Sequence, residues 1–324
     1  MTDVPLLVVN NYSQHFRINK RLTVPAVTDV SFALRRGEIF GLVGESGSGK
    51  STLGRAVMGL YTPTAGEIWF KNCRVSDKRD YRRHRRDVQR AMQIVFQDSA
   101  AALNPRMRVG DIIAEPLVIH RLHPTKAALN ERVDQLLEQV GLHVSYKSKF
   151  PGEISGGQRQ RAAIARAIAA DPELIVADEP VASLDVSIQA QIISLFRHLQ
   201  QQRGFTFLFI AHDLSLVRYL CDRVGVLYAG RLVESAPTEE LFARPLHPYT
   251  RCLLSAIPLP DPRRERNKRI LSYAPRPEDL EGEYREVSRE HFVLGVRTVE
   301  PGPAFQTPRE LTDAARSRNR EACL

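Results

Sequence analysis

The sequence predicts an α/β fold in which buried parallel strands end in polar side chains and a helical segment is inserted. Three observations predict it. An apolar run at 39–43 leads into the Gly/Ser-rich stretch GESGSGKS at 44–51. Two further largely apolar runs follow: 174–179 ends in two carboxylates, and 205–211 is followed by a histidine. From about 101 to 170, strand signals vanish and helical periodicity takes over.

Size and composition set the broad class. The 324 residues suffice for one large domain with an appendage, or for two domains. Charged residues at 26% and apolar residues at 43% are typical of a soluble protein. No apolar run reaches the length that spans a bilayer, and the N-terminus lacks a signal pattern, so we expect a cytosolic protein. Four cysteines without a C-x-x-C pair indicate a reduced compartment and argue against a structural zinc site.

The chain is basic, with 46 Lys and Arg against 37 Asp and Glu and a formal charge of +9. Much of the excess lies in two runs, 78–86 and 263–269. Contact with nucleic acid or anionic lipid is electrostatically possible. We interpret each run first as a solvated helix face or surface loop.

The N-terminal part is expected to contain strands. A short strand starts near Leu6 and leads into a loop rich in ring side chains, and a second strand covers 26–34. Phe16 could stack on a nucleotide base, with Tyr12 as the rival. A plain core aromatic is an equally good interpretation of either residue.

The stretch at 44–51 has the spacing of a phosphate-binding loop between a strand and a helix. Glycines let backbone N–H groups turn toward a triphosphate, and the helix start adds a favourable field. Lys50 should reach the terminal phosphates, and the Ser51 hydroxyl should bind Mg²⁺. The alternative is a Gly/Ser-rich turn that happens to carry a lysine. The residues expected around the triphosphate are Gly44, Ser46, Gly47, Ser48, Gly49, Lys50, Ser51 and Thr52.

The middle of the chain adds two further polar sites. A short strand at 93–98 can present the Gln97 amide to Mg²⁺ or to a water at the phosphate, unless Gln97 simply faces solvent. In the helical segment, the helix at 126–140 stops at Gly141. Ser155 can cap a later helix that runs to about 170, which creates a second anion site.

The strand at 174–179 ends in two carboxylates beside the expected phosphate loop. Asp178 is suited to hold Mg²⁺ through water, and Glu179 is suited to polarise the attacking water. A helix follows to about Arg203, and His212 after the strand at 205–211 could contact the terminal phosphate. Further strands are expected at 223–228 and 231–234, with the core closing near 243. The polar tail from 271 has no clear period, and either docks as a small extension or stays partly disordered.

Taken together, these motifs resemble the ATPase subunit of an ATP-binding cassette (ABC) transporter. Six elements occur in the family's order: the loop at 44–51, Gln97, the signature tetrapeptide Ser155, Gly156, Gly157 and Gln158, the pair Asp178 and Glu179, the triplet 183–185, and His212. The resemblance implies a RecA-like phosphate-loop core with an antiparallel β subdomain, an inserted helical subdomain and a C-terminal extension. The implied boundaries are 1–243 for the ATPase domain and 244–324 for the extension.

A narrower similarity to the oligopeptide, dipeptide and nickel importer ATPases covers roughly residues 5 to 270. It rests on the stretches 103–107, 186–191, 245–250 and 255–258, and it points to the second of the two paired ATPase subunits. The resemblance implies an ATPase that uses ATP and Mg²⁺ to drive uptake of peptides or a related small solute. It would be peripheral to the cytoplasmic face of the inner membrane, with no nucleic-acid partner.

The resemblance also implies the partners. These would be two permeases, an extracytoplasmic substrate-binding protein, and a second ATPase chain, either a paralogue or this chain itself. In the resulting head-to-tail dimer, the signature tetrapeptide and Asp185 of one chain would complete the ATP site of the other. Catalytic roles then fall to Glu179, His212 and Gln97, with Ser51, Gln97 and Asp178 at the metal.

Departures from the family pattern are small. Ile154 replaces a commoner leucine or phenylalanine, and Ala182 alters the approach to the 183–185 triplet, yet no polar group that the chemistry needs is lost. Cys323 is the one cysteine in the tail, so we expect no iron-sulfur cluster. Two rival functions remain: a soluble cassette ATPase acting on ribosomes or DNA, and an ATP-binding regulator without turnover. A single phosphate loop without sustained heptads weighs against the first, and the intact catalytic set weighs against the second.

Overall fold

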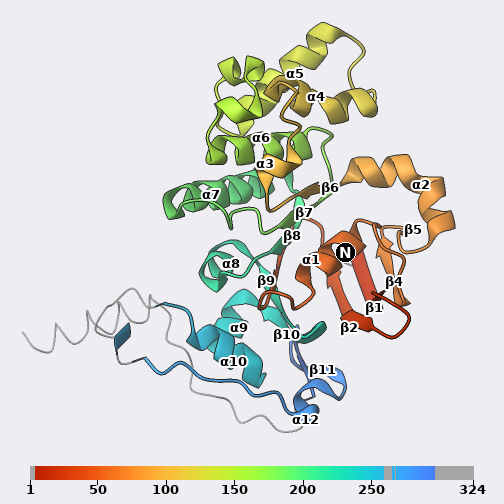
Figure 1. Ribbon diagram of the computed structural model, residues 1–324, viewed down its shortest axis with the longest axis vertical. Coiled ribbons are helices and arrows are strands. Elements are labelled where there is room, and N and C mark those ends of the chain that lie inside the picture. The colour runs from red at the N-terminus through yellow and green to blue at the C-terminus, as the bar shows by residue number, and fades with distance from the viewer. Residues whose placement is uncertain (1–3, 259–264, 267, 296–324) are drawn as a thin grey trace, which may run out of the picture. The chain divides into compact units, whose positions relative to one another are not determined.

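Strands and helices alternate along the chain in the computed structural model (Figure 1), which describes residues 4–258, 265–266 and 268–295. Residue contacts divide the chain into two units. The first comprises residues 1–222 with 227–232, and the second comprises 223–226 with 233–324. Within the described ranges, no helix is both long and apolar enough to cross a bilayer.

A parallel sheet forms the centre of the first unit. Its strand order is β3 (Ile39–Val43), β8 (Thr206–Ile210), β7 (Leu174–Asp178) and β6 (Met92–Val95). Every residue of β3, β7 and β8 is buried, as expected for parallel strands covered on both faces. Because parallel strands share one carboxyl edge, the polar residues that follow them are brought together there.

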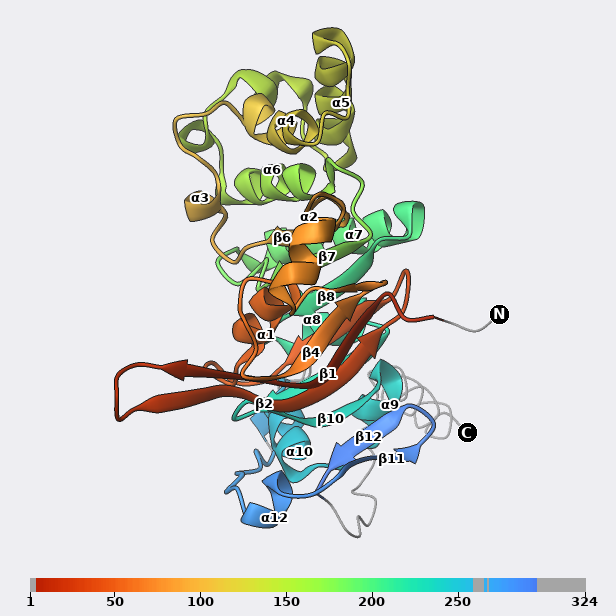
Figure 2. The same cartoon turned by 90° about the vertical axis from the view of Figure 1, so that its right-hand side faces the viewer.

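A second, antiparallel sheet completes the strands of the first unit, in the order β2 (Thr23–Leu34), β1 (Leu7–Arg17), β4 (Ala65–Phe70) and β5 (Cys73–Arg74). Figure 2 shows β1 and β2 as a long hairpin. The predicted aromatic loop after the first strand is therefore wrong. Irregular pairing shifts the register near Tyr12, and this disrupts the alternation that identifies a strand in sequence.

Helices surround the parallel sheet and fill the segment between β6 and β7. Figure 1 shows α4, α5 and α6 grouped together in that segment. Thr125 caps α5, since its hydroxyl accepts a hydrogen bond from the Ala128 N–H at 3.2 Å. The helical elements of the first unit, apart from α2, are α1 (Lys50–Val57), α3 (Ser99–Ala102), α4 (Val109–Ile119), α5 (Lys126–Gln139), η1 (Val144–Ser148), η2 (Pro151–Glu153), α6 (Gly156–Ile168), α7 (Val186–Arg203) and α8 (Leu214–Leu220).

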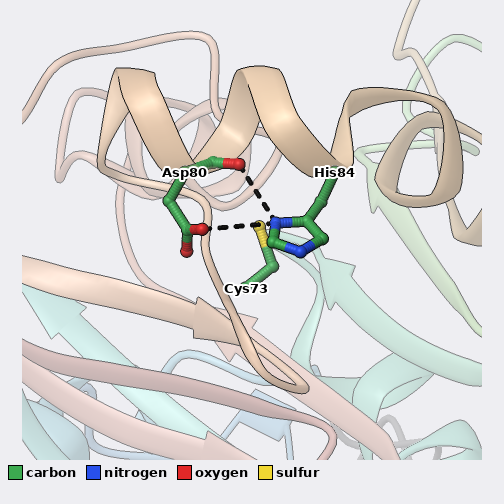
Figure 3. Close-up of side chains that lie close together, drawn as sticks. All are labelled: Cys73, Asp80 and His84. Atoms are coloured by element: carbon green, nitrogen blue, oxygen red, sulfur yellow. Dashed lines mark hydrogen bonds and ion pairs between the residues drawn. The ribbon is translucent and has the colours of Figure 1, made fainter.

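Helix α2 (Lys78–Ala91) contains the first basic run and is anchored at its N-terminal end. The Asp80 carboxylate accepts from the Arg74 N–H at 2.7 Å and lies 3.2 Å from Nδ1 of His84. Figure 3 shows Cys73 beside this pair, and the three side-chain ligand atoms lie within 4.8 Å of one another. Burial and the charge of Asp80 raise the pKa of the Cys73 thiol to about 11, so it packs as a neutral group. These contacts fix which face of α2 points outward.

The second unit contains the strand order β9 (Arg223–Tyr228), β10 (Arg231–Pro237), β12 (His291–Leu294) and β11 (Tyr284–Ser288), of which β9 and β10 also contribute residues to the first unit. Its helices are α9 (Thr238–Ala243), α10 (Pro248–Ser255) and α12 (Pro277–Leu280). In the described part of the tail, α12 and the β11–β12 hairpin are regular structure, although the sequence from 271 shows no clear period. Cys323 lies outside the described residues.

A buried carboxylate organises the second unit. Glu234 on β10 is fully buried, and its two oxygens accept from the backbone N–H groups of Leu246 and His247 at 2.7 and 2.9 Å. His291 on β12, also fully buried, lies 2.8 Å from the same carboxylate through Nε2. Buried charges of this kind are tolerated because hydrogen bonds replace their water.

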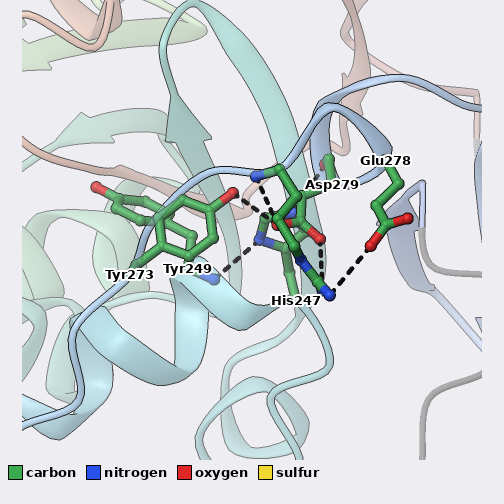
Figure 4. Close-up of polar contacts among 6 residues, drawn as sticks. His247, Tyr249, Tyr273, Glu278 and Asp279 are labelled. Carbon is green, nitrogen blue, oxygen red and sulfur yellow. Dashed lines mark hydrogen bonds and ion pairs between the residues drawn. The ribbon is translucent and has the colours of Figure 1, made fainter.

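His247 caps α10 from a fully buried position (Figure 4). Its Nδ1 accepts from the Tyr249 N–H at 3.1 Å, and the carbonyl oxygen of Asp279 lies 3.0 Å from its Nε2. Together these partners require a neutral ring with its proton on Nε2. The Asp279 carboxylate accepts in turn from Arg276, so the segment before α12 is tied to the start of α10.

Acidification should weaken the contact that His247 makes between the start of α10 and Asp279. Burial lowers the pKa of His247, despite the nearby charges of Glu234 and Asp279. The unfolded chain therefore binds a proton more readily than the folded one, and stability should fall as the pH drops below about 6.5. The thermal midpoint of the His247→Asn variant, which keeps a capping side chain but cannot titrate, should depend less on pH between 7.5 and 5.5 than that of the unchanged chain. Parallel pH curves for the two proteins would contradict this.

Candidate functional site

Two glycines shape the loop between β3 and α1. Gly44 has φ 151°, and a Cβ there would lie 2.1 Å from the carbonyl oxygen of Leu227. Gly49 has φ 102°, and its Cβ would lie 2.3 Å from the carbonyl oxygen of Ala26. The Gly230 N–H also donates to the Ser48 carbonyl at 2.9 Å. The loop is therefore held by surrounding backbone that has no room for side chains at these positions.

A matched pair of alanine substitutions can test this close packing. Gly44→Ala introduces a backbone clash, whereas Gly47→Ala, at φ 79°, meets nothing within 4 Å. Gly47→Ala should cost only the left-handed strain of roughly 1–2 kcal/mol. Gly44→Ala should therefore lower the thermal midpoint clearly more than Gly47→Ala, as measured by calorimetry without nucleotide. Equal losses would show that the Leu227 carbonyl imposes no constraint.

Lys50 lies under the loop with only 4% of its surface exposed. Its Nζ donates to the carbonyl oxygens of Gly44 and Glu45 at 2.8 and 2.7 Å. Burial lowers the pKa of Lys50, and the charges of Glu179 and Asp178 oppose that shift. The ammonium thus lies where the loop closes, facing the two carboxylates at the end of β7. Among the other predicted loop residues, Ser46 is exposed, Ser48 is buried and Thr52 is half-buried.

Ser51 at the start of α1 meets Asp178 at the end of β7. Its hydroxyl donates to the Asp178 carboxylate at 2.8 Å. Asp178 is 4% exposed, and burial raises its pKa, although the Ser51 hydrogen bond and the charges of Arg55 and Lys50 oppose the rise. A hydroxyl and a carboxylate oxygen converging at one point suit Mg²⁺, which prefers a few protein oxygens beside phosphate oxygens. These two residues fit the predicted metal site.

Glu179 is the meeting point of the remaining polar residues. Gln97, which follows β6, donates from Nε2 to a Glu179 carboxylate oxygen at 3.0 Å. Nδ1 of His212, which follows β8, lies 3.6 Å from that oxygen. Glu179 itself has a left-handed backbone with φ 47°, and its N–H donates to the Ile210 carbonyl. Three strand ends therefore direct one amide, one carboxylate and one imidazole to a common point.

A small cavity of about 30 Å³ lies beside this cluster, lined in part by Glu179, His212 and Gln189. That volume holds a single water molecule. A carboxylate next to a water-sized space can accept a proton from water. The arrangement is therefore suited to hydrolysis.

The signature residues Ser155 to Gln158 form the N-terminal cap of α6. Ser155 and Gln158 cap α6 reciprocally, with hydrogen bonds of 2.9 and 3.3 Å. Gln158 also donates to the Tyr146 hydroxyl at 2.7 Å. A Cβ on Gly157 would lie 2.7 Å from Ile188, whereas Gly156 has more space. Figures 1 and 2 both place α6 in the helical part of the first unit, away from α1, so this cap and the phosphate loop are not joined within one chain.

Three predicted positions remain. Phe16 is half-buried, and its ring packs edge-on against Tyr61 with centroids 5.2 Å apart. Tyr12 is fully buried and donates to the Gln14 side chain, so it is a core residue and not a rival for base stacking. Asp185 is exposed at the start of α7. Tyr61 and Tyr146 were not predicted, because no local motif signals a tyrosine that supports a residue far away in sequence.

The fold and the site define a phosphate-loop nucleoside triphosphatase, with a loop lysine, a hydrogen-bonded serine–aspartate pair and a glutamate beside a water-sized space. Comparison with known families supports this class of protein. The family profile described as ABC transporter matches residues 27–182, and that of the oligopeptide/dipeptide transporter C-terminal region matches 233–283.

Curated relatives extend the match over most of the chain. The oligopeptide transport ATP-binding protein OppF of Bacillus subtilis is 53% identical over 89% of this chain and 95% of its own length. A putative peptide import ATP-binding protein of Brucella ovis is 52% identical over 84% of both chains. The chain belongs to the ABC transporter family.

Solved structures agree on the fold. The ATP-binding cassette MJ0796, in a dimeric post-hydrolysis state with ADP and phosphate, is similar with a TM-score of 0.64 at 28% identity, over 72% of this chain and 98% of that one. CbiO1 from Clostridium perfringens gives the same TM-score at 27% identity, over 74% of this chain and 90% of that one. The predicted α/β phosphate-loop core is thereby confirmed.

Proposed function

We propose that this chain is the ATP-hydrolysing subunit of an importer for peptides. The observation that carries the proposal is the convergence of Gln97, Glu179 and His212 next to the Ser51–Asp178 pair. The names of its relatives, which include oligopeptide transport and peptide import ATP-binding proteins, support the choice of transport and of peptides.

Each residue then has a defined task. Backbone N–H groups of 44–51 and the Lys50 ammonium bind the triphosphate, and Phe16 supports the adenine. Ser51 and Asp178, with Gln97 nearby, hold Mg²⁺, which supplies charge neutralisation at the phosphates when bound. Glu179 accepts the proton of the attacking water, and Gln97 and His212 keep its carboxylate oriented.

The site requires a second chain. Ser155 to Gln158 and Asp185 belong to the proposed ATP contacts, yet the α6 cap is separated from the phosphate loop of its own chain. A head-to-tail dimer would bring the helix start of one chain, with its positive field, to the ATP of the other. The second chain is either a copy of this one or a paralogous ATPase.

The dimer acts with other subunits at the cytoplasmic face of the inner membrane. Two permeases form the path for the solute, and an extracytoplasmic binding protein delivers it. Gln97 and the helical segment face the permeases, so that closure of the dimer is relayed to them. Residues 244–324 are the C-terminal extension of this transporter type.

A pull-down tests the proposal. The tagged Glu179→Gln chain with ATP is recovered from detergent-solubilised membranes of the native host, and the co-purifying chains are identified. Two multi-spanning permeases, with or without a second ATPase, are the expected result. Ribosomal proteins or DNA without permeases would overturn it in favour of a soluble cassette ATPase.

A further inference from the structure

The outer face of α2 is strongly basic. The helix packs through Tyr81 and Val88, and its outer face carries six cations with Asp87 as an exposed carboxylate among them. Those six, all exposed, are Lys78, Arg79, Arg82, Arg83, Arg86 and Arg90.

These charges are only partly neutralised by neighbouring carboxylates. Asp80 is turned toward Arg74 and His84, whereas Asp87 is exposed one turn from Arg83 and Arg90. None of the six cationic side chains forms an ion pair within 4.0 Å among the residues that the structure describes. The six positions extend over about 18 Å of a straight helix, at a rise of 1.5 Å per residue. The face, defined by these six residues, is a strip of positive potential in which the cations outnumber the nearby carboxylates Asp77 and Asp87.

We infer that this basic face of α2 binds the anionic phospholipid surface of the membrane. Clusters of four to eight Lys and Arg on one helix face attract acidic headgroups. The face carries no aromatic side chain on which nucleic-acid bases could stack, and no apolar side chain that would insert into the bilayer. The choice of a membrane as partner rests on the proposed function, which places the chain at a bilayer. The contact is electrostatic, reversible and weakened by salt.

The inferred contact lies close in sequence to the catalytic cluster. Helix α2 ends at Ala91 and continues directly into β6, after which Gln97 contacts Glu179. The test variants avoid Arg90 because it is the member nearest to β6. They also avoid Asp80 and His84 because these residues anchor the helix. Arg82, Arg83 and Arg86 are at the centre of the face and are replaced by glutamine, which is a good helix former.

The experiment is vesicle flotation of the full chain at low salt. Vesicles of phosphatidylglycerol with phosphatidylcholine are compared with pure phosphatidylcholine. The unchanged chain should float only with the anionic vesicles and be released by added salt. R82Q/R83Q/R86Q should bind on the order of 100-fold more weakly, since each basic residue contributes about fivefold. The control R17Q/K20Q/R21Q removes the same charge from exposed positions around the β1–β2 turn and should bind nearly as well as the unchanged chain.

Several results would overturn the inference. Equal losses in both triple variants would show that only net charge matters, and no loss in either would show that α2 is not the contact. A defect of the α2 variant confined to a DNA duplex, or to a poly-glutamate peptide, would assign the face to nucleic acid or to an acidic protein. ATP binding and circular dichroism verify that the variants fold. Vesicle binding requires no permease. The flotation experiment can therefore be interpreted even if the pull-down recovers no permeases.

Discussion

The Glu179→Gln variant should hydrolyse ATP about 10²- to 10⁴-fold more slowly than the unchanged chain, which is the range for loss of a general base. Glutamine has the same shape and can still meet Gln97, but it cannot accept a proton from water. ATP affinity should persist, because Ser51, Lys50 and the loop backbone are unchanged. Phosphate release under saturating ATP, together with equilibrium ATP binding, measures both effects.

A matched control for this prediction is Glu131→Gln, which makes the same chemical change at an exposed position of α5. It should leave turnover unchanged. Wild-type turnover in the Glu179→Gln variant would remove Glu179 from its assigned role. Loss of ATP binding together with turnover would instead show that residue 179 supports the fold of the site.

The second large effect is expected at Lys50, where alanine should weaken ATP binding by roughly 10- to 150-fold. That range corresponds to the 1.5–3 kcal/mol of hydrogen bonds made to a charged group. The side chain is buried, and its Nζ is held by two loop carbonyls in front of the carboxylates at the end of β7. Calorimetric titration with ATP and Mg²⁺ measures the affinity.

Lys71→Ala serves as the control for charge removal. Lys71 pairs with Glu173 outside the nucleotide site, and its side chain is 39% exposed, so ATP affinity should not change. Circular dichroism separates lost binding from lost folding in the Lys50 variant. Unchanged affinity in a folded Lys50→Ala chain would contradict the proposed contact between the ammonium and the phosphates.

Much of the site could be predicted because its residues follow strands that the sequence marks clearly. The runs before Gly44, Glu179 and His212 are largely apolar, and parallel strands end at the same edge of a sheet. Chain order alone therefore predicts that Asp178 lies near Ser51. The confirmed fold class follows from the same runs.

Other features depend on contacts that leave no local pattern. The first strand continues through Tyr12 to Arg17 because a partner strand pairs with it across shifts in register. The β11–β12 hairpin is largely exposed and polar on β11, so its residues lack the alternation of a half-buried strand. The Tyr146 contact to Gln158 crosses a gap in sequence that no motif spans.

The backbone conformation of Glu179 also sets thermal stability against ATP turnover in this chain. At φ 47° a residue with a side chain is held in a conformation that glycine adopts without penalty, and the difference amounts to about 1 kcal/mol or more. A glutamate at position 179 therefore lowers the thermal stability relative to glycine, but it places a carboxylate next to Gln97 and His212. A selection for heat resistance alone would favour glycine there and would enrich chains that bind ATP but no longer turn it over.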